Sequence, residues 1–101
     1  MDLTDCLDIE QSGRAGRITV KIGGAVLPFD WEVGAAPVVA IVYVPSPDEW
    51  SVREPWRKLN RDEVLKALGI EICRIKCRSC EHRFDDDFLE LREPMPSQCG
   101  R

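Results

Sequence analysis

The residues best suited to chemistry lie close together in residues 70–84, which read IEICRIKCRSCEHRF. This stretch contains the only histidine of the chain and three of its five cysteines: Cys73, Cys77, Cys80 and His82. Two residues separate Cys77 from Cys80, a spacing at which two thiolates can hold one zinc ion through a tight turn. The stretch therefore predicts a metal-binding or redox site.

The flanking residues add a resemblance to a known family. Residues 75–84, IKCRSCEHRF, resemble the first knuckle of a zinc ribbon, as in the small regulatory zinc-ribbon proteins. Residues 95–100, MPSQCG, resemble the second knuckle, with about 18 residues between Cys80 and Cys99. Glu81 and Met95 stand where the pattern has a glycine and a cysteine. The resemblance covers about a quarter of the chain and implies a C-terminal β-hairpin that carries a structural zinc ion.

The resemblance implies three zinc ligands, Cys77, Cys80 and Cys99, whereas a tetrahedral site needs four. His82 is near enough to be the fourth. Cys73 fits less well, because an extended strand would separate it from Cys77 by roughly 13 Å. The fourth ligand could also come from Cys6, Met95, an aspartate of residues 85–87, or another subunit. The pattern also leaves open a knuckle without metal, or a redox dithiol, which would need the cysteines at the start of a helix.

Composition predicts a single domain. The chain has 101 residues, of which 44% are hydrophobic and 32% charged, as in soluble globular proteins. We expect a sheet-plus-helix body over residues 1–69 and a ribbon-like subregion over residues 70–101. The acidic N-terminus has no apolar segment and the cysteine count is odd, which together predict a cytoplasmic protein without a signal peptide or membrane span.

Charge is unevenly distributed along the chain. Residues 1–52 carry 8 acidic and 3 basic side chains, residues 53–83 carry 5 and 9, and residues 84–101 carry 5 and 2. The net charge is −4. These segments could neutralise one another in the fold, or the basic middle could form a patch for an acidic partner.

The elements that would position these groups follow from periodicity. Alternating apolar residues predict strands over residues 17–22 and 25–33, joined by Gly23-Gly24. Pro28 places the second strand at a sheet edge or breaks it. The run VVAIVYV, residues 38–44, predicts a buried central strand, and residues 1–12 fit a short helix.

Two helices are predicted next. Ser46, Pro47 and Glu49 have the order of a helix start. Asn60 and Gly69 have the types expected just before and just after a helix. Beyond residue 69 we expect an extended segment that aligns Arg74, Lys76 and Arg78 on one face. The predicted fold class is therefore α+β: a small antiparallel sheet, one or two short helices and a zinc-ribbon-like hairpin over residues 70–92.

The chain has no catalytic triad, phosphate loop or nucleotide-binding glycine pattern, which predicts a non-enzymatic protein without a small-molecule substrate. The favoured hypothesis is a protein-binding module of the inhibitor, immunity or anti-defence type. Trp50 and Trp56 are its candidate anchors, although they fit the core better. The alternative is a transcriptional regulator that contacts nucleic acid. Its phosphate-binding residues would be Arg74, Lys76, Arg78 and Arg83. A homo-oligomer is compatible with either hypothesis.

Overall fold

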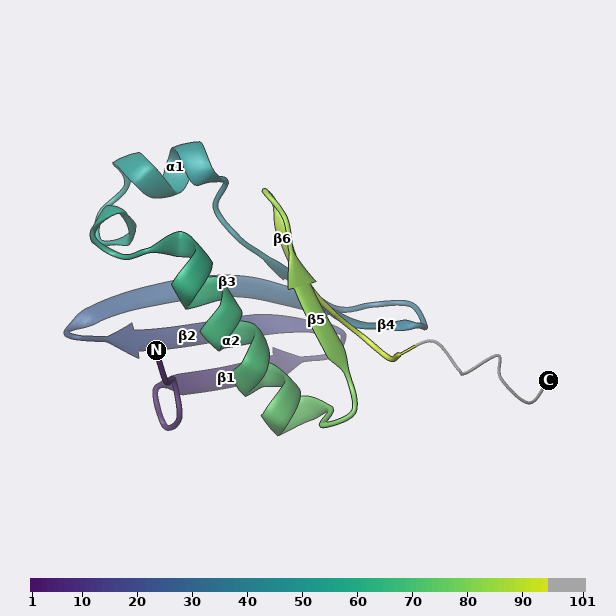
Figure 1. Ribbon diagram of the computed structural model, residues 1–101. Coiled ribbons are helices and arrows are strands. Elements are labelled where there is room, and N and C mark those ends of the chain that lie inside the picture. Colours follow the sequence, from purple (N-terminus) through teal and green to yellow (C-terminus); the bar gives the residue numbers. More distant parts are fainter. Residues whose placement is uncertain (95–101) are drawn as a thin grey trace.

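The computed structural model describes residues 1–94 and shows a six-stranded antiparallel sheet with two α-helices (Figure 1). The expected α+β class is confirmed, with the sheet as its larger part. The elements in chain order are β1 (Leu7–Ser12), β2 (Ala15–Ile22), β3 (Ala25–Val33), β4 (Val38–Tyr43), α1 (Pro47–Val52), a 3₁₀ turn (Trp56–Lys58), α2 (Arg61–Lys76), β5 (Glu81–Phe84) and β6 (Phe88–Arg92). In space the strands follow the order β1-β2-β3-β4-β6-β5.

The strands alternate between a buried and an exposed face, as their sequences predict. On β3, Leu27, Phe29 and Trp31 are buried, whereas the intervening Pro28 and Asp30 are exposed. Successive side chains of a strand point to opposite faces, so the buried side chains all lie on one face of the sheet, and this face packs in the core. Within residues 1–94, α2 covers only this face, and the alternate residues of the strands are half-buried or exposed.

The N-terminal segment is a strand, so the helix expected over residues 1–12 is wrong. β1 pairs with β2 across a turn at Gly13, which places Leu7 opposite Val20 and Ile9 opposite Ile18. Both β1 side chains then lie on the core face at the spacing of two that a strand requires. One helical turn of apolar residues was too weak a signal to outweigh this pairing.

Pro28 is accommodated because β3 has a free side over residues 25–30. Although β3 is an inner strand, β4 pairs only with its residues 31–33. Pro28 therefore faces no strand on that side within the described residues, and its missing N–H costs no ladder hydrogen bond. β4 itself lies between β3 and β6, which confirms its expected central position. The expected burial on both faces is wrong: Ala40 and Val42 are buried, whereas Tyr43 on the other face is exposed.

Both predicted helix starts are confirmed. The Ser46 hydroxyl accepts from the Glu49 backbone N–H at 3.2 Å, and the Asn60 side chain accepts from the Glu63 N–H at 3.0 Å. These contacts satisfy backbone donors that have no partner inside the helix. No helix in the described part of the chain has the length and apolar character to cross a membrane.

The end predicted for the second helix is wrong. α2 is 16 residues long and passes through Gly69 to Lys76. Gly69 does not have a positive φ, so it is not a left-handed terminator. Instead it provides space: a Cβ at this position would lie 2.3 Å from Nδ1 of His82 on β5. The glycine permits a close approach of strand to helix.

The longer helix changes the C-terminal region. Residues 70–76 are helical, so the extended basic segment expected there is wrong, and the last hairpin consists of β5 and β6 alone. The buried Ile72 and Cys73 continue the apolar stripe of α2 beyond Gly69. Burial against the sheet outweighs the modest helix penalty of one glycine.

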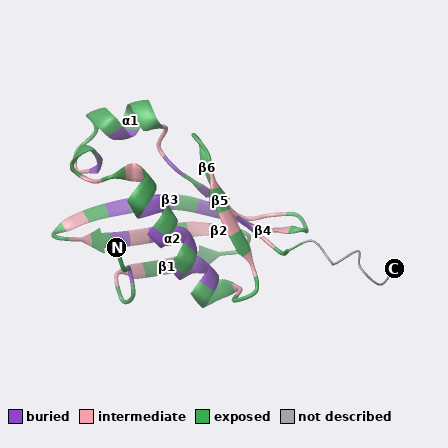
Figure 2. Ribbon diagram, in the orientation of Figure 1, coloured by how far each residue is buried: buried purple, intermediate pink, exposed green. Residues whose placement is uncertain are grey.

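The core lies between α2 and one face of the sheet (Figures 1 and 2). β6 contributes Leu89 and Leu91, both fully buried, directly beside β4. The last hairpin therefore extends the sheet formed by the first four strands. The largest fully buried side chains are Phe29, Ile18, Leu27, Leu65, Leu68, Leu89 and Leu91.

Candidate functional site

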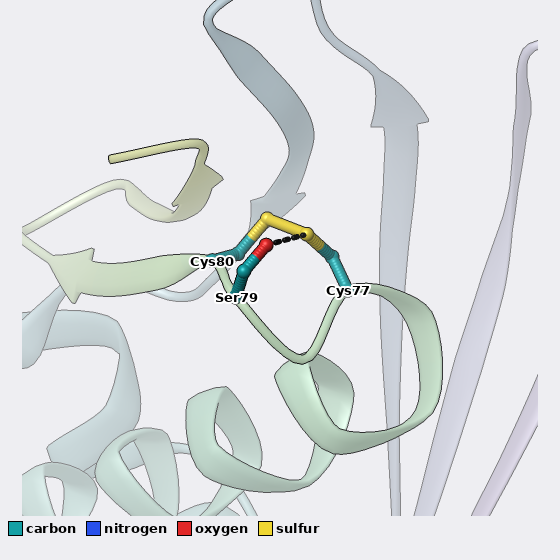
Figure 3. Close-up of a disulfide and its surroundings, with 3 residues drawn as sticks. All are labelled: Cys77, Ser79 and Cys80. Atoms are coloured by element: carbon teal, nitrogen blue, oxygen red, sulfur yellow. Dashed lines mark hydrogen bonds between the residues drawn. A yellow bond between two sulfur atoms is a disulfide. The ribbon is translucent and has the colours of Figure 1, made fainter. Parts of the chain in front are cut away.

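The predicted cysteine site is the turn between α2 and β5, shown in Figure 3. Cys77 and Cys80 form a disulfide with their Cα atoms 5.4 Å apart. The Cys80 N–H donates to the Cys77 carbonyl at 3.0 Å and closes the turn. Ser79 Oγ lies 3.7 Å from the Cys77 sulfur. The turn is therefore closed both by a backbone hydrogen bond and by the cross-link.

The position of this turn on the helix bears on its chemistry. Cys77 is the C-cap of α2, and its N–H donates to the Cys73 carbonyl. The C-terminal end of a helix carries partial negative charge, which disfavours a thiolate. Catalytic disulfides instead use a helix N-terminus to stabilise the attacking thiolate. The geometry therefore favours a cross-link over a redox centre.

The structure brings together only two of the predicted metal ligands. A disulfide and a pair of zinc-bound thiolates exclude each other, so Cys77 and Cys80 could bind metal only when reduced. Cys99 lies outside the described residues. Within residues 1–94, no group of three or more His, Cys, Asp or Glu side chains is arranged to hold a metal ion.

His82 lies on β5 and packs its ring against Gly69 of α2. Its Nδ1 atom is buried and has no hydrogen-bond partner among the described residues. The contact that the structure gives this ring is therefore with the helix.

Within residues 1–94, Cys73 and Cys6 are free thiols. Cys73 is buried, and its burial raises the pKa of the thiol. Because residues 73–77 are helical, Cys73 lies one turn before Cys77, closer than the extended segment that we expected. A buried protonated thiol acts as a small apolar side chain.

The four basic residues predicted for nucleic acid do not form a row. Arg74 forms a bidentate pair with Glu71, whose carboxylate is buried at 4% exposure. This pairing raises the pKa of Arg74 through the hydrogen bond and the charge of Glu71. Lys76 Nζ lies 5.6 Å from the centroid of the Trp31 ring.

The other two basic residues have different surroundings. Arg83 contacts Glu90 on β6 at 3.6 Å. Arg78 occupies the cysteine turn and forms no ion pair in the described part of the chain. Arg74 and Lys76 lie on the last turn of α2 and Arg78 lies in the turn beyond it, so the single basic face expected for a strand is lost. Arg74 and Arg78 still line one shallow hollow with His82, whereas Lys76 lies over Trp31.

Trp50 and Trp56 are core residues, each 3% exposed. Their ring centroids are 4.9 Å apart, and Trp56 also packs edge-on against Phe29 at 5.2 Å. The Trp50 indole N–H donates to the Leu59 carbonyl at 2.9 Å. Their burial leaves neither ring presented to a partner.

An exposed aromatic pair was missed by the sequence interpretation. Tyr43 on β4 and Phe88 on β6 lie directly opposite each other on the uncovered face, with ring centroids 5.5 Å apart. They are 41% and 39% exposed. Only the alternation in residues 38–44 could have indicated that Tyr43 faces outward, and the pairing of β4 with β6 was not visible in the sequence.

Charged groups of both signs surround this pair: Arg83 lines a hollow with Phe88, and Arg17 and Arg53 line another with Tyr43. The Tyr43 hydroxyl donates to the Glu32 carboxylate, which raises the pKa of Tyr43. The turn before Phe88 contains Asp85, Asp86 and Asp87. Backbone N–H groups of Asp87 and Phe88 donate to the Asp85 carboxylate and lower its pKa. We call the rings of Tyr43 and Phe88 together with these four carboxylates the outer aromatic patch.

Comparison with protein-family models, curated proteins and solved structures finds no match to this chain.

Proposed function

We propose that the protein is a small non-enzymatic protein-binding module that docks through the outer aromatic patch. One observation carries this proposal: α2 covers one face of the sheet, while the opposite face presents two adjacent, partly exposed rings. Aromatic side chains are enriched at the centres of protein interfaces, where they supply most of the binding energy. An inhibitor, immunity or anti-defence protein would use such a surface.

The charges around the rings specify the partner. The patch includes four carboxylates, those of Glu32 and Asp85 to Asp87, and three arginines line the hollows beside its rings. The whole chain has a net charge of −4. The partner would therefore present an apolar recess with basic groups opposite the carboxylates and acidic groups opposite the arginines, because complementary charge accelerates association and excludes wrong partners. The net negative charge of the chain also disfavours nucleic acid, whose phosphates it would repel.

The test compares two variants in affinity capture followed by calorimetry with the purified captured protein. Tyr43→Ala combined with Phe88→Ala should weaken binding at least a hundredfold, a typical effect of removing two anchors. Val52→Ala is the matched control, because Val52 is 74% exposed and lies on α1. Equal binding by the double variant and the wild type would overturn the proposal.

A salt titration of DNA and RNA binding tests the other class of partner. We expect no binding at low salt. Steeply salt-dependent binding that is lost on Arg78→Ala would instead assign a nucleic-acid function. Arg78 is the suitable residue because Arg74→Ala would also leave the buried Glu71 carboxylate unpaired.

We also propose that the reduced protein binds a structural zinc ion through Cys77, Cys80 and Cys99, with His82 as the candidate fourth ligand in a ribbon-like C-terminus. The CxxC turn and the resemblance of residues 75–100 support this. His82 would have to leave its contact with Gly69 to take part. Elemental analysis of reduced protein should give near-stoichiometric zinc that disappears in Cys77→Ser, and a metal-free wild type would refute the site.

A further inference from the structure

The core face of the sheet contains a hollow that α2 does not fill. It has a volume of about 200 Å³ and lies where the last turn of the helix crosses β1 to β4. Eight of its ten lining residues are apolar, and the two polar ones are Gln11 and Lys76. The apolar lining is Ile9, Ile18, Trp31, Val33, Val39, Ala40, Val42 and Ile72.

The wall formed by Trp31 is held in a defined position. Its indole N–H donates to the Glu10 carbonyl at 3.1 Å, across the intervening strand β2. The indole can reach that carbonyl because residue 16 is glycine: a Cβ there would lie 2.9 Å from Nε1 of Trp31 and 1.9 Å from the Glu10 oxygen. A fixed ring favours a preformed site over a gap that collapses.

Among the described residues that line the hollow, Lys76 is the one with a charge. It is the last residue of α2, and its ammonium lies 5.6 Å from the Trp31 ring centroid. An apolar chamber with a single cation beside it is complementary to a molecule with an apolar body and one negative charge. A more highly charged headgroup would find no second cation in the lining.

We propose that this hollow binds a small monocarboxylate, with its apolar body in the chamber and its carboxylate at Lys76. An apolar cavity of about 150 Å³ holds benzene, so this volume suits an apolar body of about eight carbon atoms. The site is independent of the outer aromatic patch, which lies on the opposite face of the sheet.

Titration of the ¹⁵N-labelled full-length protein with octanoate, followed by NMR, tests the proposal. The indole N–H signal of Trp31 should shift in a saturable manner. The indole signals of Trp50 and Trp56 should remain in place, because neither residue lines the hollow. Phe88→Ala should leave the octanoate affinity unchanged, which separates this site from the proposed protein interface.

Three comparisons make the result decisive. Lys76→Gln should weaken octanoate binding about fivefold, or about 1 kcal/mol, as for an exposed ion pair. Octan-1-ol should bind wild type and Lys76→Gln equally. Val39→Phe, at the half-buried edge of the hollow, should abolish the Trp31 shift in a protein whose circular dichroism remains native.

The proposal is overturned if the Trp31 signal does not saturate, or if Lys76→Gln binds octanoate as tightly as wild type. It is equally overturned if light scattering shows a dimer that Val39→Lys dissociates, because a second copy of the chain would then occupy the hollow.

Discussion

The cysteine turn and the outer aromatic patch are opposites in sequence and in structure. The turn contains the residue types most often used in chemistry, yet the fold joins its two sulfurs to each other and packs the nearby histidine on a helix. The patch consists of residues that carry no motif, yet they share the exposed face of the sheet. Side chains of reactive types can thus serve as structural contacts in the fold. A binding surface, in contrast, depends on which strands lie next to each other in the sheet.

The largest difference in stability should be between a variant that loses a buried aromatic ring and one that loses an exposed ring. Trp56→Ala should lower the free energy of unfolding by about 3–5 kcal/mol, because it leaves a cavity beside Trp50 and Phe29. Phe88→Ala should lower it by about 1 kcal/mol, since the ring is already 39% exposed. Urea denaturation of both variants measures the difference. Similar losses would mean that the patch belongs to the core and is not a free surface.

A substitution at Gly69 tests how closely β5 packs against α2 beside the cysteine turn. Gly69→Ala should destabilise the protein by about 1–3 kcal/mol, because the new methyl would overlap His82. In a helix free of that contact, the same change stabilises by about 0.5–1 kcal/mol.

The informative measurement is therefore whether Gly69→Ala stabilises or destabilises the protein in two backgrounds, the wild type and His82→Ala. In His82→Ala protein, Gly69→Ala should become stabilising, which a double-mutant cycle by urea denaturation will show. If Gly69→Ala stabilises the wild type, the contact between β5 and α2 has room for a methyl group.

The disulfide should have a moderate effect that depends on redox conditions. Cys77 and Cys80 are three positions apart, and the loop-entropy estimate for so short a loop is about 2 kcal/mol. Cys77→Ser should lower the free energy of unfolding by this amount under oxidising conditions and by little in reductant, when metal has been removed by chelation. An equal loss in reductant would mean that the thiols stabilise the turn without the cross-link.

The sequence predicted the local structure better than the functional surfaces. Helix starts at Ser46 and Asn60 were predictable because capping needs only neighbouring residues. The end of α2 was not, because Gly69 is explained by His82, which is 13 positions away and reaches it only through the tertiary fold. The β1 strand was missed for a similar reason, since its pairing with β2 decides its conformation.

The candidate sites were harder still to predict. Cys77 and Cys80 were recognisable from spacing, but spacing alone cannot show whether two sulfurs face a metal or each other. Tyr43 and Phe88 are 45 positions apart, and only the insertion of β6 beside β4 brings them together. Lys76 was assigned to a basic face that required an extended backbone, whereas the helix directs it over Trp31.

The smallest predicted effect concerns the turn that positions Phe88. The Asp85 carboxylate accepts from the backbone N–H groups of Asp87 and Phe88, both at 2.9 Å. Its pKa is lowered from the ordinary value of 3.8, chiefly by these two bonds. The carboxylate therefore contributes stability that is fully present above about pH 4 and is lost as the pH falls through the lower pKa of the folded state.

Asp85→Ala should lower the free energy of unfolding at pH 7 by about 1 kcal/mol, the usual net value of such hydrogen bonds. Asp85→Asn keeps an acceptor oxygen but has no titrating group. It should therefore retain most of the stability at pH 7, and its free energy of unfolding should fall less than that of the wild type below pH 4. Urea denaturation between pH 2 and pH 7 measures both. Arg61 independently binds the carbonyls of Asp85 and Asp86 at 2.8 and 3.0 Å, so the turn should persist in either variant. Identical acid profiles for Asp85→Asn and wild type would show that this carboxylate does not order the approach to Phe88.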